Sequence, residues 1–139
     1  MDRRGQGRTY FVIDGPQRRR FDVRVERRAA ILHEIEKRSS DPALSAITVA
    51  NVLGVTARYV HLLLEETGAS FSHHVLDRRL ERAAALLRDP QWRDRLIIEI
   101  AAEAGFTDIS HFNRAFRRKF RTTPSVIRKS SGRDEKLER

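Results

Sequence analysis

The segment GFTDISHFNRAFRRKF, residues 105–120, carries the side chains best suited to contact a nucleic acid. Phe112, Phe116 and Phe120 recur at every fourth position, so they lie along one slowly drifting face of a helix. The rest of its surface is hydrogen-bonding at the start and cationic towards the end: Ser110, His111, Asn113, Arg114, Arg117, Arg118 and Lys119. A groove-binding helix needs base-reading and then phosphate-neutralising groups. An ordinary amphipathic helix needs only solubility from these positions, so this segment alone leaves both interpretations open.

The composition favours a polyanionic partner. The 139 residues include 28 basic and 19 acidic ones, a formal net charge of +9, which suits DNA, RNA or an anionic membrane surface. No stretch approaches the roughly 20 apolar residues of a membrane span, and the first residues, MDRRGQGR, lack the apolar region of a signal peptide. The absence of cysteine excludes disulfides and cysteine-based zinc fingers. We therefore expect a soluble, cytoplasmic, basic protein.

Helical periodicity organises most of the chain, and the predicted class is all-α with seven helices. Ser45 and Thr56 are suitable N-caps, as is Thr107 or Asp108 for the opening helix, while Gly54, Gly68 and Gly105 end helices. The predicted helices cover approximately residues 26–39, 46–53, 57–66, 72–87, 94–104, 108–120 and 124–127. We expect residues 1–25 to form a basic, poorly ordered arm with a β-like run at residues 10–14. The alternative is that the arginines of residues 15–28 contact phosphates. We expect residues 130–139 to form a polar tail.

A pattern that occurs twice divides residues 26–129 into two similar units. Ala50-x-x-x-Gly54-Val55-Thr56 precedes apolar anchors at Val60 and Leu64, and Ala101-x-x-x-Gly105-Phe106-Thr107 precedes anchors at Phe112 and Phe116. A small residue, a turn glycine and a capping hydroxyl in this order are typical of a helix-turn-helix. The predicted units cover about residues 45–68 and 94–120, joined by a linker helix at about 72–87. A linker of about 16 residues spans roughly 24 Å, which would place the two projecting helices about 34 Å apart, one turn of B-DNA.

Residues 31–128 resemble the DNA-binding region of the AraC/XylS family of bacterial transcription regulators. The matching runs are YVHLLLEETGASFSHHVLDRRLERAAALLRDP and IIEIAAEAGFTDISHFNRAFRRKFRTTPSVIR. The resemblance implies seven helices, with two helix-turn-helix units bridged by the fourth helix. It also implies base-facing positions in both second helices: Ala57, Arg58, His61 and Leu62 in the first, and Ile109, Ser110, His111, Asn113 and Arg114 in the second.

The side chains at these positions suit base recognition. Arg58 and Arg114 can bind guanine in bidentate fashion, Asn113 can pair with adenine, and Ile109 can contact a thymine methyl group. Phosphate contacts are expected from Arg117, Arg118 and Lys119.

Two positions depart from the family pattern. Leu62 stands where the family commonly has arginine, so the first unit is expected to read fewer bases or to rely on thymine methyl groups. Arg121 stands where the family usually has glycine, at the C-terminal turn of the sixth helix, and a left-handed conformation there would cost about 1 kcal/mol. Arg79, in the linker helix, fits either a structural ion pair or a phosphate contact.

The leading functional hypothesis is a sequence-specific regulator of transcription that binds double-stranded DNA as a monomer and recruits or blocks RNA polymerase. The alternatives are a protein-interaction module, favoured by Leu62 at a reading position, and the DNA-binding fragment of a larger effector-sensing regulator. We expect no enzymatic activity, cofactor or metal, because the sequence has no glycine-rich phosphate loop, nucleophile–base pair or ligand cluster.

Overall fold

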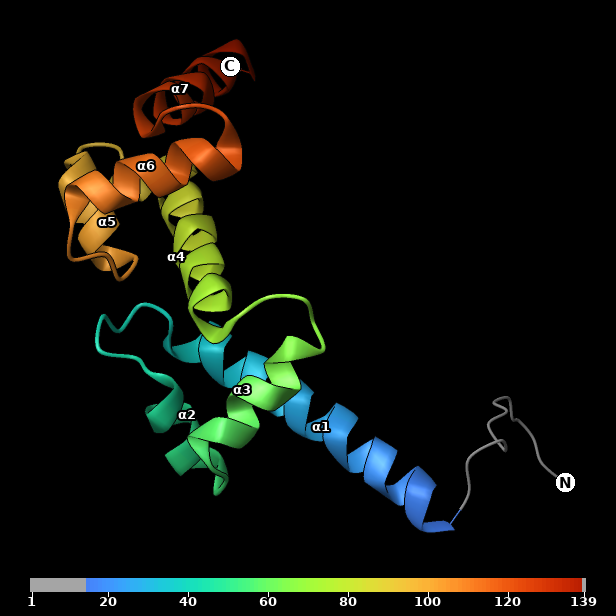
Figure 1. Cartoon of the computed structure of the whole chain (residues 1–139). Coiled ribbons are helices and arrows are strands. Elements are labelled where there is room, and N and C mark those ends of the chain that lie inside the picture. Colours follow the sequence, from blue (N-terminus) through green and yellow to red (C-terminus); the bar gives the residue numbers. More distant parts are fainter. Residues whose placement is uncertain (1–14, 139) are drawn as a thin grey trace, which may run out of the picture.

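The computed structural model describes the backbone of residues 15–138 and the side chains of residues 22–132, and this part of the chain is all-α as predicted (Figure 1). It contains seven α-helices and one short 3-10 helix. Their bounds are α1 Gly15–Arg38, α2 Ala46–Leu53, α3 Ala57–Glu65, α4 Phe71–Arg88, η1 Pro90–Trp92, α5 Ile97–Glu103, α6 Ile109–Phe120 and α7 Pro124–Glu138.

The helices form two units, each with its own apolar core, and α4 belongs to both. In Figure 1 α4 runs from the group α1–α3 to the group α5–α7. The first core contains Ile31, Ile35, Val49, Val60, Leu63, Leu64, Phe71 and Val75. The second core contains Leu80, Ala83, Leu87, Ile100, Phe106, Phe112 and Phe116. The predicted pair of helix-turn-helix units bridged by a long helix is therefore confirmed.

Capping groups and glycines define the turn of each unit. Ser45 Oγ accepts a hydrogen bond from Thr48 N at 3.3 Å at the start of α2, and Thr56 Oγ1 accepts one from Tyr59 N at 3.0 Å at the start of α3. These contacts satisfy backbone donors that have no partner inside the helix. Gly54 in the first turn has φ +70° and Gly105 in the second has φ +111°, a region that side-chain-bearing residues avoid.

The start of α6 resolves the choice between Thr107 and Asp108. Asp108 Oδ1 accepts hydrogen bonds from Ser110 N at 2.9 Å and His111 N at 3.3 Å, so Asp108 is the N-cap. At the other end, Arg121 has φ +60° and ψ +24°, as expected for a C-terminal turn where glycine would be favoured.

The N-terminal helix is longer than predicted. It begins at Gly15 rather than near Glu26, so residues 15–25 of the expected arm are helical, whereas residues 1–14, including the β-like run, lie outside the described part. Pro16 is acceptable in the first turn of a helix because its missing N–H has no partner there in any case. Arg24 and Arg28 both bond to the carboxylate of Glu66 just after α3. No local sequence pattern reveals this contact between α1 and the residue that follows α3.

The C-terminal helix also extends beyond its predicted end near Ile127, through most of the expected polar tail, to Glu138. Arg128 fastens its beginning to the segment before α5, donating from Nη2 to Arg95 O at 2.7 Å and from Nη1 to Arg93 O at 3.3 Å. The residues that follow are mainly polar helix formers, whose lack of apolar periodicity concealed the helix.

Candidate nucleic-acid interface

The second helix of the first unit, α3, buries its apolar residues and exposes the predicted reading positions. Val60, Leu63 and Leu64 are fully buried, which seats α3 on α1 and α2. Arg58, His61 and Leu62 are exposed, whereas Ala57 is half-buried at the start of the helix. Leu62 is 46% exposed, a large apolar side chain on an otherwise polar surface. The structure therefore brings Arg58, His61 and Leu62 to one outward face.

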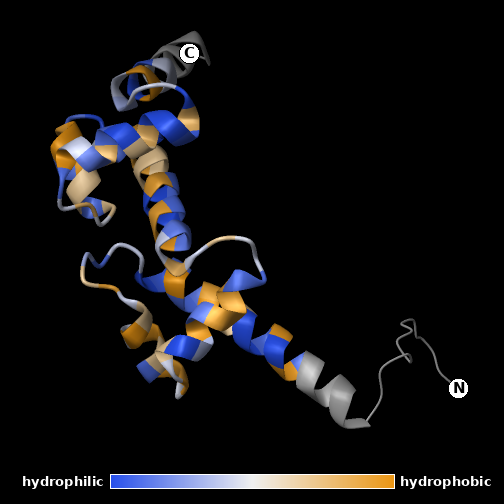
Figure 2. Ribbon diagram, in the orientation of Figure 1, coloured by the Kyte–Doolittle hydropathy of each residue, from blue (hydrophilic) through white to orange (hydrophobic). Residues whose placement is uncertain are grey.

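The corresponding helix of the second unit, α6, has the same division. Phe112 and Phe116 are fully buried, and their ring centroids lie 5.5 Å apart. Phe106 and Phe120 extend this aromatic row, with centroids 4.9 Å from Phe112 and 4.6 Å from Phe116, respectively. Phe112 and Phe116 thus act as core anchors, as predicted. In Figure 2 the ribbon of α6 is mainly hydrophilic and is interrupted by short apolar patches.

The exposed side chains of α6 include most of the predicted site. They are Ser110, His111, Asn113, Arg114, Arg117 and Arg118, while Ile109 is half-buried. Within residues 22–132, the guanidinium groups of Arg58, Arg114, Arg117 and Arg118 have no carboxylate partner. These four cations are available to an external polyanion because no carboxylate within residues 22–132 neutralises them.

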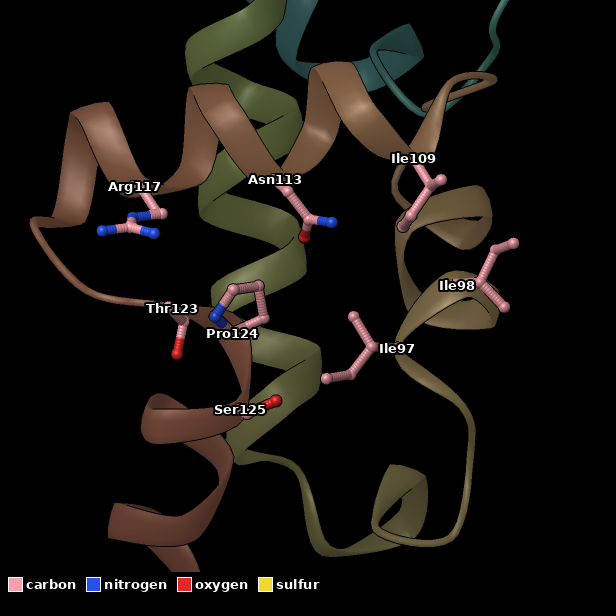
Figure 3. A pocket seen from close by; sticks show the side chains of 8 residues that line it. All are labelled: Ile97, Ile98, Ile109, Asn113, Arg117, Thr123, Pro124 and Ser125. Atoms are coloured by element: carbon pink, nitrogen blue, oxygen red, sulfur yellow. The ribbon is translucent and has the colours of Figure 1, made fainter.

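One side of α6 borders a depression of about 490 Å³ (Figure 3). Ile109, Asn113 and Arg117 line it from α6, one turn apart, and Asn113 and Arg117 extend on the side where Thr123 and Pro124 lie. The remaining lining residues are Ile97, Ile98 and Ser125. The sequence pattern did not reveal this depression because its opposite walls come from α5 and α7.

Lys119 has a different partner from the one predicted. Its Nζ lies 2.5 Å from Asp77 Oδ1 and 3.1 Å from Glu81 Oε2, both on α4, and its side chain is 26% exposed. The hydrogen bond to Asp77 raises the pKa of Lys119, although partial burial opposes this shift. Two carboxylates thus occupy the ammonium group that we had expected to contact a phosphate. Helical periodicity places Lys119 beside the core, but only the tertiary structure puts acidic residues opposite it.

Arg79, for which two roles were open, forms structural contacts. Its Nε donates to Ser39 O at 2.7 Å and its Nη2 donates to Asp41 O at 2.9 Å. Burial lowers the pKa of Arg79, and the nearby Asp41 carboxylate opposes this shift. The guanidinium group remains charged at neutral pH.

Comparison with known proteins agrees with the helix-turn-helix fold described above. The model of a helix-turn-helix domain family matches residues 49–130. The solved C-terminal domain of AraT, a response regulator from Geobacillus stearothermophilus, superposes with a TM-score of 0.65 at 29% identity, covering 74% of this chain and 84% of that one. A solved transcriptional regulator from Chromobacterium violaceum, described as containing an AraC-type DNA-binding domain, gives 0.65 at 27% identity over 74% of this chain and 89% of that one.

The chain belongs to the AraC/XylS family.

Its relatives in this family include transcriptional activators. The chain is 33% identical to the transcriptional activator RhrA of Rhizobium meliloti (strain 1021) over 103 residues, which cover 74% of this chain and 32% of the relative. It is 37% identical to the activator RhaS of Enterobacter sp. (strain 638) over 92 residues, which cover 66% of this chain and 31% of the relative. The chain thus spans about a third of the length of these relatives.

Membership of the AraC/XylS family identifies residues 49–130 as a helix-turn-helix domain of the AraC type. No single helix within residues 15–138 is long and apolar enough to cross a membrane. Helices α2 and α3 are long and apolar enough for a membrane span only when they are taken together, and this pair is bent by 104°.

Proposed function

We propose that the domain recognises a specific double-stranded DNA sequence by inserting α3 and α6 into successive major grooves on one face of the duplex. The observation that carries this proposal is the duplicated arrangement. In both units a helix with a fully buried apolar side presents exposed hydrogen-bonding groups and unneutralised arginines. One helix with such an exposed surface is common in proteins. Two of them, joined by the single helix α4, match the regular repeat of grooves along a DNA duplex, which is a polyanion.

The residues divide into reading and anchoring groups. Arg58 and Arg114 bind guanine O6 and N7 with both arms of the guanidinium group, and Asn113 binds adenine N6 and N7. Ser110, His111 and His61 supply further hydrogen bonds to base edges, while Leu62 and Ile109 contact thymine methyl groups. Arg117 and Arg118 bind phosphates, which fix the register without reading sequence. We leave Lys119 out of the phosphate-binding group, because its ammonium group already forms ion pairs with Asp77 and Glu81.

The regulatory role follows from placing the bound domain at a promoter, where it recruits or blocks RNA polymerase. One chain supplies both reading helices, so binding requires no dimer. A protein-interaction module is the second candidate function, and the exposed Leu62 favours it. Against that candidate stands the charge of the surface, since an apolar partner groove would leave the arginines of α6 desolvated without acceptors.

Selection of bound duplexes from a random library at about 150 mM salt tests the proposal, since salt screens non-specific attraction. The expected product is an asymmetric motif with two half-sites centred about one helical turn apart. A motif covering one half-site would limit reading to one unit. No enrichment would reject sequence-specific binding and favour the interaction module or the fragment of a larger regulator.

A further inference from the structure

The two apolar cores meet along α4 without merging. Phe71 and Val75 on α4 belong to the first core, and the second core begins at Leu80. The intervening stretch of α4 contains Leu76, which packs against the second core, and the charged residues Asp77, Arg78 and Arg79. The junction between the two helix-turn-helix units is therefore partly polar.

Arg79 crosses this junction. Its two hydrogen bonds end on the carbonyl oxygens of Ser39 and Asp41, in the segment between α1 and α2 of the first unit. Ser39 is only 4% exposed, so its carbonyl lies in the interior beside the guanidinium group. Backbone carbonyls cannot change rotamer, so these acceptors fix Arg79 more firmly than a flexible carboxylate would.

The turn between α5 and α6 in the second unit lies against the same two groups, the Ser39 carbonyl and the Arg79 guanidinium. A Cβ atom at Gly105 would lie 2.7 Å from Ser39 O and 2.8 Å from Arg79 Nε, far inside normal contact distance. Gly105 thus approaches both the carbonyl that Arg79 binds and the guanidinium group itself. At this point the end of α1, the middle of α4 and the turn between α5 and α6 come together.

The other charged contacts near the junction each fasten α4 to one unit only. Arg78 pairs with Glu36 on α1 at 3.5 Å, and Arg82 pairs with Glu103 on α5 at 3.2 Å. All four side chains are more than 40% exposed, and such surface pairs contribute little. Arg79 differs because it is partly buried, hydrogen-bonded to the first unit and in contact with the second.

We propose that Arg79 is a positioning residue that fixes the orientation of the two helix-turn-helix units and thereby the half-site spacing that the domain accepts. This inference rests on the proposed two-groove function. Apolar contact is non-directional, whereas the planar guanidinium fork is directional. The spacing is sensitive to such rotation, because one inserted base pair moves the second half-site by about 3.4 Å and turns it by roughly 35°.

The first test measures the binding of variants to a duplex selected by the unaltered domain, and to the same duplex with one base pair inserted between the half-sites. For the unaltered domain the insertion should weaken binding by at least about thirtyfold. For Arg79→Met it should weaken binding by only about threefold, with binding to each isolated half-site unchanged. The matched control Arg78→Met, which loses only its exposed pair with Glu36, should keep the full penalty. Equal insertion penalties in Arg79→Met and the unaltered domain would overturn the proposal.

The second test needs no DNA. The chain has no cysteine, so Asn51→Cys on α2 and Ala102→Cys on α5, both at exposed positions, accept one spin label per unit. The distance distribution between the labels should be narrow in the otherwise unaltered domain and in Arg78→Met, but distinctly broader in Arg79→Met. An unchanged distribution would refute the positioning role.

The two tests separate failure of this inference from failure of the proposed function. If library selection yields no duplex, two-groove recognition fails, yet the label distances still decide whether Arg79 orients the units. If circular dichroism shows that Arg79→Met does not fold, Arg79→Lys replaces it, since lysine keeps the charge and loses the fork. Its label distribution should then be broader than that of the unaltered domain, and an equally narrow one would overturn the proposal.

Discussion

The ammonium group of Lys119 on α6 lies 2.5 Å from the Asp77 carboxylate on α4. Glu81, one turn further along α4, approaches the same Nζ at 3.1 Å. Helix α6 is therefore fastened to α4 by its last turn, while Arg114, Arg117 and Arg118 of α6 face outward. Basic residues that are neighbours in sequence, Arg118 and Lys119, consequently have different roles.

Lys119→Met should lower the melting temperature of the domain and leave the salt dependence of DNA binding unchanged, because the ammonium group already has two carboxylate partners. The matched substitution Arg118→Met should leave the melting temperature unchanged and reduce the slope of log K against log salt by about one, as expected for loss of one phosphate contact. Calorimetry and binding at several salt concentrations measure both quantities. A reduced slope for Lys119→Met would return this lysine to the phosphate-binding group.

Gly105→Ala should destabilise the domain much more than Gly54→Ala. Both glycines have positive φ, so both substitutions strain the backbone, by about 1 kcal/mol in the left-handed region of Gly54. Only at Gly105 would the new methyl group also collide with a backbone oxygen, Ser39 O, at 2.7 Å, whereas Gly54 has nothing within 4 Å. We expect a loss of roughly 2–4 kcal/mol for Gly105→Ala in urea-unfolding experiments. Equal losses at the two positions would show that Gly105 is needed for its dihedral angle alone.

Much of the fold was predictable because its signals are local. Ser45, Thr56 and Gly54 are a few residues from the helix ends that they define, and Phe112 and Phe116 reveal the buried side of their helix by spacing alone. The exposed positions Arg58, His61 and Arg114 follow from the same periodicity, combined with the family resemblance.

The remaining features depend on what stands opposite a side chain, which periodicity does not reveal. The sequence pattern placed Lys119 among the expected phosphate contacts and did not reveal that Asp77 and Glu81 face it. Residues 15–25 have no apolar stripe of their own, and their helix is fastened to Glu66, far away in sequence. The sequence neighbours of Arg79 were equally consistent with an ion pair and with a phosphate contact, and the structure instead shows hydrogen bonds to the backbone carbonyls of Ser39 and Asp41.

Stability should decrease on acidification below about pH 6.5, in part because of His74. Desolvation by burial is the main cause that lowers the pKa of His74, and the adjacent His73 adds to it. The unfolded chain therefore binds a proton at a pH where the folded domain does not, so the contribution of His74 is present above its unfolded pKa and is lost as pH falls through the folded one. His74→Gln should flatten the decrease in unfolding free energy as the pH falls below about 6.5. His33→Gln, at an exposed position on α1, is the control, and an unaltered pH profile for His74→Gln would contradict this assignment.

Arg114→Ala should cost about 1–3 kcal/mol of binding free energy on the selected duplex and relax the preference at a single base pair. Removing a base-reading side chain weakens the correct site most and random DNA least, so the ratio of specific to non-specific affinity should fall. Repeating the selection with the variant measures this directly. If binding to selected and random duplexes fell by the same factor, Arg114 would be a phosphate contact.

The central claim is that α3 and α6 occupy two successive major grooves, and methylation interference on the selected duplex tests it most directly. Methylation of guanine N7 blocks the major groove, so only guanines contacted there affect binding. Two clusters of interfering guanines are expected on one face of the duplex, about one helical turn apart. Arg58→Ala should abolish one cluster and Arg114→Ala the other. A single cluster removed by Arg114→Ala alone, or no interference from any methylated guanine, would contradict recognition by both helices.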